Sequence, residues 1–196
     1  MREIYLDNAA TTPVDPAVAQ VAVRVMEELY GNPSSLHKKG LEAQLLLEKA
    51  REQMADALGC QPEEVYFTSG ATESNNIAIQ GVFAAHRRRG NTLISTAVEH
   101  SSVRSPLQML AQQQNANVVL VGPQPDGSID PDQLCREVTG DTLLVSCNLV
   151  NSEVGAVCDL AAIARQAKKR NPKVLVHTDG VQAFGKVDFS LKKLGV

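Results

Sequence analysis

The chain has 196 residues, which is enough to bury a substantial core as one domain or as a domain and a half. Its 43% hydrophobic and 21% charged residues are typical of a globular protein, and its net charge of −3 gives no reason to expect a nucleic acid partner. No apolar run is long enough to span a membrane, so we expect no membrane association. The four cysteines lie far apart without a CxxC pair, which predicts reduced thiols in a cytoplasmic protein and no metal site.

Two helices are predicted in the first third of the chain. The first begins with Asp15 as N-cap and Pro16 at the first helical position, a favourable combination at a helix start. The second follows Ser35, has apolar residues at spacings of three and four, and ends at Gly59. Residues 1–15 belong to neither pattern, and we expect them to form a separate N-terminal segment.

Five short apolar strands then alternate with helices. The strands are predicted at residues 65–67, 92–96, 117–122, 142–147 and 173–179. The helices between them are predicted to begin near residues 71, 101, 130 and 159. Strands joined by helical crossovers form a parallel sheet that is covered on both faces. The sequence therefore predicts an α/β fold, a three-layer sandwich with a mainly parallel sheet.

Polar residues follow the carboxyl ends of these strands, where sheets of this kind bind ligands. The small-residue turn at 68–72 enters a helix, whose free N–H groups and the hydroxyl of Thr72 can cradle a phosphate. The other strands deliver an imidazole, two side-chain amides and a carboxylate: His100, Asn151, Gln182 and Asp179. We expect these groups to converge on one edge of the sheet.

Each candidate also has a plainer interpretation. A small-residue turn can cap a helix without binding any ligand, and His100 could cap the helix that follows it. Asn151 could only stabilise a turn, and Asp179 could be an N-cap. His177, on the same strand face as Asp179, is expected to be a core histidine. The convergence of several candidates on one edge is what favours a ligand site.

The candidate site favours one cofactor over the generic alternative. A dinucleotide is the usual ligand of such a sheet, but no GxGxxG motif follows any strand. Pyridoxal phosphate needs its phosphate tethered at one end and its protonated pyridine nitrogen paired with an Asp at the other. Asp179, at the end of an apolar strand, can supply that carboxylate, so we expect pyridoxal 5'-phosphate as the cofactor.

Six segments resemble the motifs of cysteine desulfurases of the nitrogen-fixation and iron–sulfur-cluster branch, which are class V aminotransferase-type, fold type I pyridoxal-phosphate enzymes. They occur in the family's order: YLDNAATTPVDP, GNPSSLH, FTSGATESNN, VEHSSV, NLVNSEVGAV and HTDGVQAFGK. The resemblance implies that residues 16–196 form the cofactor-binding large domain, incomplete at its C-terminal end. Residues 1–15 would be an N-terminal segment that docks on the small domain or the cleft.

The resemblance also implies that six residues bind the cofactor: Ala71, Thr72, His100, Asn151, Asp179 and Gln182. The phosphate would be held by Ala71 and Thr72. The 3-oxygen side of the ring would be held by the two side-chain amides. Two of the six would be catalytic: His100 stacks over the pyridine ring and moves protons, and Asp179 pairs with the pyridine nitrogen.

The family converts L-cysteine to L-alanine and passes the sulfur to an enzyme cysteine as a persulfide. The expected partners are a sulfur acceptor or iron–sulfur scaffold protein and a second copy of the chain in a homodimer. The family's cofactor-binding lysine, in a Ser-Gly-His-Lys stretch, and its persulfide cysteine have no match here, since Lys186 lies in a different context. We therefore expect this stretch to be the N-terminal half of such an enzyme and to be inactive alone.

Two departures from the family pattern and two alternative functions stay open. Ser152 stands where Asn is usual, and Gly180 stands where Ala is usual. Selenocysteine lyases share nearly all of these motifs. A naturally short chain could also act without catalysis, as a dimerisation or regulatory partner of a complete enzyme.

Overall fold

The computed structural model describes residues 3–196 and divides the chain into two compact units, one ending at Tyr66 and the other spanning Phe67–Val196. Each unit is described by itself. The expected separation of residues 1–15 from residues 16–196 stays a prediction. No helix of the described residues has both the length and the apolar character needed to cross a bilayer.

The first unit is helical. It contains two α-helices and one 3₁₀ helix: α1 (Pro16–Glu28), α2 (Lys38–Leu58) and η1 (Pro62–Glu64). Asp15 caps α1, because its Oδ1 accepts a hydrogen bond from the Ala17 N–H at 2.7 Å. Gly59 ends α2 in the left-handed region at φ 70°, a conformation that favours glycine. Both predicted helices are thus confirmed.

The second unit is built on a parallel sheet with strand order β2-β1-β3-β4. The strands are β1 (Thr92–Thr96), β2 (Asn117–Val121), β3 (Thr142–Ser146) and β4 (Leu175–His177). All three pairings are parallel, as the helical crossovers predicted. Four of the five predicted strands are confirmed, and the last of them is shorter than expected.

The strand predicted at residues 65–67 was wrong. The Val65 N–H donates to the Pro62 carbonyl, and the Val65 carbonyl accepts from the guanidinium of Arg51. Both backbone groups of Val65 therefore have partners other than a strand: a local carbonyl for the N–H, and a side chain of α2 for the carbonyl. The Tyr66 side chain is 82% exposed, so the apolar character of the segment does not correspond to a buried strand.

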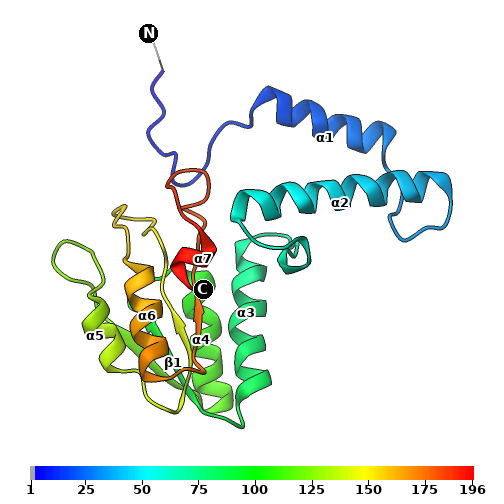
Figure 1. Ribbon diagram of the computed structural model, residues 1–196. Helices are drawn as coiled ribbons and strands as arrows, with labels where there is room; N and C mark the ends of the chain where they lie inside the picture. Colours follow the sequence, from blue (N-terminus) through cyan, green and yellow to red (C-terminus); the bar gives the residue numbers. More distant parts are fainter. Residues whose placement is uncertain (1–2) are drawn as a thin grey trace. The chain divides into compact units, whose positions relative to one another are not determined.

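Helices cover both faces of the sheet, with α3 and α4 on one side and α5 and α6 on the other (Figure 1). Their bounds are α3 (Ala71–His86), α4 (Ser101–Gln114), α5 (Pro131–Arg136) and α6 (Leu160–Arg170). Neighbouring strand residues enter opposite cores: Leu93 packs with the α3 and α4 side, and Ile94 packs with the α5 and α6 side. This is the predicted three-layer sandwich.

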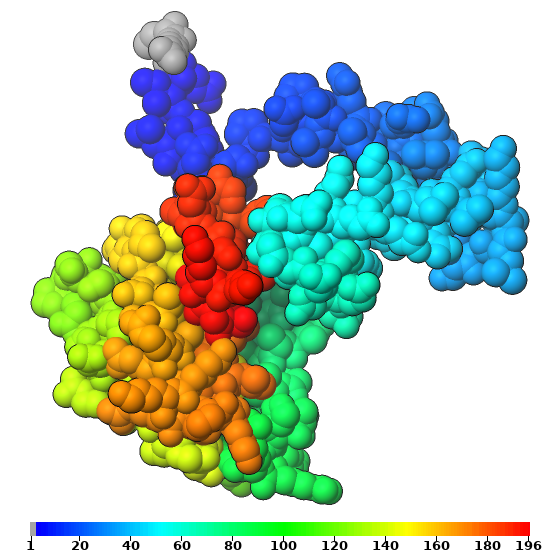
Figure 2. Space-filling model, in the orientation of Figure 1, coloured from blue at the N-terminus to red at the C-terminus, as the bar shows by residue number. Residues whose placement is uncertain are grey.

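A short helix that the sequence did not predict, α7 (Leu191–Leu194), packs against α6. The Lys168 ammonium on α6 donates to the Gly195 carbonyl just after α7. In Figure 2 the red C-terminal segment lies against the orange surface of α6. The end of the described chain is therefore tied to the layered core.

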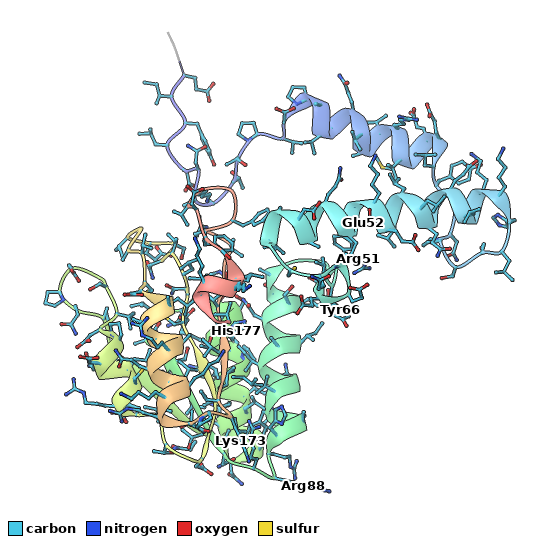
Figure 3. The ribbon with its side chains drawn as sticks, in the orientation of Figure 1. Arg51, Glu52, Tyr66, Arg88, Lys173 and His177 are labelled. Atoms are coloured by element: carbon cyan, nitrogen blue, oxygen red, sulfur yellow. The ribbon has the colours of Figure 1, made fainter. Side chains whose placement is uncertain are left out.

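The N-terminus of α3 lies at the end of the sheet where the strands finish. Figure 3 shows Lys173, before β4, and His177, at its end, toward opposite ends of this strand, with Arg88 near the Lys173 end. Arg89, just after α3, donates from Nη2 to the Lys173 carbonyl at 2.9 Å. Because the last residues of α3 lie beside the start of β4, the first residues of α3 lie toward the end of β4. We call the end of the sheet at which the strands finish the carboxyl edge.

Candidate functional site

Asp179 lies two residues beyond β4, at the carboxyl edge, and its carboxylate is held by two donors. Oδ2 accepts from Asn75 Nδ2 at 2.8 Å, and Oδ1 accepts from the Val181 N–H at 3.0 Å. The second contact orders the turn at residues 181–186, and because no helix begins there, Asp179 is not the helix N-cap of the plainer interpretation. The first comes from a buried amide on α3 and fixes the carboxylate from another layer of the fold.

Asn75 is the residue that the sequence interpretation missed. Its side chain is 4% exposed and contacts three residues on separate segments: Ser102, His177 and Asp179. A signal for it existed, because Asn75 shares the buried stripe of α3 with Ile79 and Phe83 at a spacing of four residues. A polar residue on such a stripe needs buried partners.

His100 is the N-cap of α4, and its imidazole is exposed. Nδ1 accepts from the Ser102 N–H at 3.1 Å and lies 2.8 Å from the Ser102 hydroxyl. The capping role is thus real. It occupies only one ring nitrogen, and the hydroxyl contact links His100 to Asn75, since Asn75 Nδ2 lies 2.9 Å from the same Ser102 Oγ.

Ala71 and Thr72 are the first two residues of α3, where N–H groups have no partner within the helix. The first helical bond joins the Ser74 N–H to the Gly70 carbonyl. Ser69, just before the helix, donates its N–H and hydroxyl to the exposed Glu73 carboxylate at 2.6 and 2.7 Å. These bonds lower the pKa of Glu73. The turn is therefore preordered by Ser69 and Glu73, and the N–H groups of Ala71 and Thr72 lie between them in sequence.

Asn151 is buried and orders the loop after β3. Its Oδ1 accepts from the N–H groups of Glu153 and Val154 at 2.9 and 3.0 Å, as a turn former does. Its Nδ2 donates to the Val98 carbonyl at 3.0 Å, two residues before His100. One amide hydrogen of Asn151 is thus committed to the loop that carries His100.

Gln182 lies in the turn after Asp179, at residues 181–186, and its Oε1 accepts from the Lys186 ammonium. Gln182 is three residues after Asp179, and the segment between them is a turn and not a helix.

The predicted site residues are connected to one another. Hydrogen bonds link Asp179 to His100 through Asn75 and Ser102, and Asn151 contacts the segment that leads to His100. Ala71 and Thr72 join this group through the first turn of α3, which ends at Asn75.

Buried polar atoms without a hydrogen-bond partner also gather at the carboxyl edge. Within the described residues they are Ser95 Oγ, Glu99 Oε2 and Thr178 Oγ1. Ser95 lies near the end of β1, Glu99 follows β1, and Thr178 immediately precedes Asp179. Such atoms are rare in folded proteins, and their clustering is typical of a functional site.

Two titratable groups, the buried Glu99 and the partly buried His177, flank the site. Burial raises the pKa of Glu99 to about 7, although the Asn148 N–H at 2.7 Å and the Thr96 hydroxyl at 3.0 Å stabilise its ionised form. Burial lowers the pKa of His177, and the nearby Asp179 carboxylate opposes this shift. The carboxyl is thus partly protonated near neutral pH, and the imidazole is neutral.

The four cysteines are free thiols. Cys135, Cys147 and Cys158 are buried, and burial raises the pKa of Cys135. A packed thiol such as that of Cys135 does not ionise readily at neutral pH. Within residues 3–196, no group of three or more His, Cys, Asp and Glu side chains is arranged to hold a metal ion.

Residues 4–196 match the aminotransferase class-V family, so the chain belongs to that family. Among curated proteins it is similar to cysteine desulfurase IscS of Pseudomonas syringae pv. tomato, with 42% identity over 98% of this chain and 48% of that protein. It is also similar to the mitosomal cysteine desulfurase of Trachipleistophora hominis, with 41% identity over 99% of this chain and 44% of that protein. The chain thus spans about half the length of the curated relatives it matches.

Solved structures show the same relationship. A NifS-like protein superposes with a TM-score of 0.96 at 40% identity, over 100% of this chain and 53% of that chain. A structure described as SspA in complex with cysteine superposes with a TM-score of 0.92 at 31% identity, over 98% of this chain and 55% of that chain. The expected fold, part of the large domain of a fold type I pyridoxal-phosphate enzyme, is confirmed.

Proposed function

We propose that the chain is the cofactor-binding part of a pyridoxal-phosphate-dependent cysteine desulfurase. The complete protein would convert L-cysteine to L-alanine and pass the sulfur to an enzyme cysteine as a persulfide, for iron–sulfur cluster assembly. The observation that carries the proposal is the Asp179 carboxylate, held at the carboxyl edge by Asn75 one helical turn from the start of α3. The names of the curated relatives support the reaction.

The described residues fit the cofactor at both of its ends. The N-terminus of α3 offers N–H groups and a positive dipole end, which suit a phosphate dianion. The Asp179 carboxylate offers an anion, which suits a protonated pyridine nitrogen. When bound, pyridoxal phosphate supplies an electron sink for the substrate's bond cleavage.

We assign each candidate residue a role toward that cofactor. Ala71 and Thr72 hold the phosphate. The Asp179 carboxylate keeps the pyridine nitrogen protonated through charge attraction. His100 covers the ring face and moves protons with its exposed imidazole. Asn151 holds the 3-oxygen side with its second amide hydrogen, and Gln182 acts beside it.

The proposed partners follow from the same reaction. L-cysteine is the substrate, and the cysteine named in the description of one structural neighbour supports that choice. A sulfur-acceptor or scaffold protein receives the persulfide sulfur. We also propose a homodimer and a cytoplasmic location for the complete protein.

The test uses the complete gene product. Purified protein is mixed with pyridoxal 5'-phosphate, dialysed, and examined for cofactor absorbance; alanine release is then measured from L-cysteine and from L-selenocysteine. We expect retained cofactor and alanine from L-cysteine in the presence of a thiol acceptor. Release from selenocysteine alone would favour the sister lyase. A protein that retains no cofactor would refute the proposal.

A further inference from the structure

Asn75 joins three segments of the second unit through one side chain. Its Nδ2 lies 2.8 Å from Asp179 Oδ2, after β4, and 2.9 Å from Ser102 Oγ, on α4. Its Oδ1 lies 3.2 Å from His177 Nε2, on β4. The side chain is almost fully buried, so water does not substitute for any of these partners.

The proton positions around Asn75 follow from the chemistry of its partners. An ionised carboxylate only accepts, so Nδ2 and not Oδ1 must face Asp179. The second Nδ2 hydrogen is then donated to Ser102 Oγ. The Ser102 hydroxyl hydrogen remains for His100 Nδ1, 2.8 Å away. Because Nδ1 accepts from both the hydroxyl and the Ser102 N–H, it carries no proton.

The opposite side of Asn75 has an equally determined arrangement. Oδ1 can only accept, so His177 Nε2 carries the proton that is donated to it. His177 Nδ1 is then the acceptor of the Ser146 hydroxyl at 2.8 Å. The hydrogen bonds therefore run in one direction, from Ser146 through His177, Asn75 and Ser102 to His100, with a branch to Asp179.

We propose that Asn75 is a positioning residue, whose two amide hydrogens orient the Asp179 carboxylate and, through Ser102, the His100 imidazole. The catalytic consequence rests on the proposed function, because only a bound cofactor gives both groups a common target. The hydrogen-bond arrangement does not rest on it. Asn75 thus determines the orientation of two side chains that lie 79 residues apart in the sequence, at positions 100 and 179.

Asn75→Asp is the most informative variant, because it keeps the shape of the side chain and replaces its two donor hydrogens with acceptors. The Ser102 hydroxyl then turns toward position 75 and no longer donates to His100 Nδ1. The new carboxyl also lies beside the Asp179 carboxylate, and because two such groups cannot both ionise in contact, the pair retains one proton between them. Asn76→Asp is the matched control: it makes the same substitution one residue along α3, where Asn76 bonds to the Thr72 carbonyl and Gln80 instead.

Long-range proton–nitrogen NMR correlations of the ¹⁵N-labelled chain without cofactor provide the readout, with each imidazole assigned by a single His→Gln variant. In the unsubstituted chain we expect His100 and His177 to carry their neutral-form proton on Nε2. In Asn75→Asp, the His100 Nδ1 resonance should shift toward that of a free acceptor. Asn76→Asp should leave it unchanged.

Ser102→Ala provides a second test, should Asn75→Asp not fold. Removing this small hydroxyl should shift the His100 Nδ1 resonance in the same direction and change both side-chain amide proton resonances of Asn75. Unchanged His100 resonances in folded Asn75→Asp, or in Ser102→Ala, would overturn the proposal.

Turnover of the complete gene product separates this proposal from the proposed function. Asn75→Asp should lower kcat by roughly 10- to 100-fold, a range typical for residues that orient a functional group, with little change in KM. Asn76→Asp should stay near the parent rate. A parent protein that binds no cofactor would refute the proposed function and leave the NMR result standing, whereas unaltered kcat in folded Asn75→Asp would refute the positioning role.

Discussion

Glu99 is a carboxyl group buried one residue before His100, and it is stabilised unevenly. Oε1 accepts from the Asn148 N–H and the Thr96 hydroxyl, while Oε2 has no partner among the described residues. Burial opposes its charge, and the negative Asp179 opposes it further, so its pKa rises to about 7. The thiols of Cys147 and Cys158 also lie close enough to be influenced by its charge.

The raised pKa of Glu99 predicts a pH-dependent stability. The folded state holds the Glu99 proton up to about pH 7, whereas the unfolded state releases it near pH 4.5. Stability from this group is therefore fully present below pH 4.5 and is lost as the pH rises to about 7. The loss is at most about 3 kcal/mol, at about 1.4 kcal/mol per pKa unit.

Glu99→Gln isolates that contribution. Urea unfolding midpoints of parent and variant are measured from pH 4.5 to pH 8. As the pH rises, the midpoint of the variant should increase relative to that of the parent, because only the parent loses stability when Glu99 ionises. The partly buried His177 changes stability with the opposite sign, but it is common to both proteins and cancels in the difference. Glu73→Gln, which removes an exposed carboxylate of lowered pKa, is the control. A constant difference across this pH range would contradict the assignment.

Asp179 provides the second prediction at this scale. Asp179→Asn keeps the shape of the side chain but removes the charge that we propose pairs with the pyridine nitrogen. Turnover of the complete gene product should fall by about two orders of magnitude or more. Asp188→Asn changes the same charge on an exposed residue of the following segment and should have little effect. Near-normal turnover of Asp179→Asn would show that the carboxylate only caps a turn.

At the scale of secondary structure, local sequence patterns predicted most helices and strands. They could not predict which side chains contact each other between different layers of the fold. Caps and periodicity located α1 to α6, and apolar runs located β1 to β4. The strand predicted at residues 65–67 was wrong because the backbone groups of Val65 bond to Pro62 and to the Arg51 side chain, which composition does not reveal. Asn75 and Asp179 are 104 residues apart, so no local pattern encodes their contact. The candidate site was thus predicted residue by residue, but not the amide that connects its members.

The helix α3 also allows a prediction about glycine. A Cβ added at Gly81 meets no atom within 4 Å, and the residue lies on an exposed helical face. Gly81→Ala should therefore stabilise the chain by about 0.5–1 kcal/mol, because alanine loses less entropy in a helix.

Gly90, which lies just before β1, should respond in the opposite direction. A Cβ there would lie 2.2 Å from the Asp141 carbonyl oxygen, so Gly90→Ala forces backbone to move at a cost of about 1–3 kcal/mol. Urea unfolding of the two variants against the parent compares them directly. Equal changes would contradict the packing described at Gly90.

At the scale of the whole chain, large apolar side chains remain exposed on α1, none of whose residues is buried. Val18 and Val21, one helical turn apart, are each 60% exposed. The polar residues of this helix form a separate stripe that includes Gln20 and Arg24. Exposed apolar surface of this kind promotes association with other apolar surfaces.

This exposure gives the last prediction. The purified chain should enhance the fluorescence of an apolar dye and sediment as associated species at high concentration. The double variant Val18→Lys, Val21→Lys should lower both signals, because it places charges on the exposed apolar face. Gln20→Lys, on the polar stripe, should not. Equal behaviour of both variants would mean that α1 does not drive association.

The bond between Asn75 and Asp179 also imposes an order of events during protein synthesis. The ribosome releases α3 long before it releases Asp179, because 104 residues separate the two partners. A nascent chain that ends within β3 has the α3 N-terminus but not the carboxylate, and the Asn75 amide lacks its acceptor. On the proposed function, such a chain cannot hold the cofactor at both ends. Cofactor retention would then report that β4 has docked on the sheet.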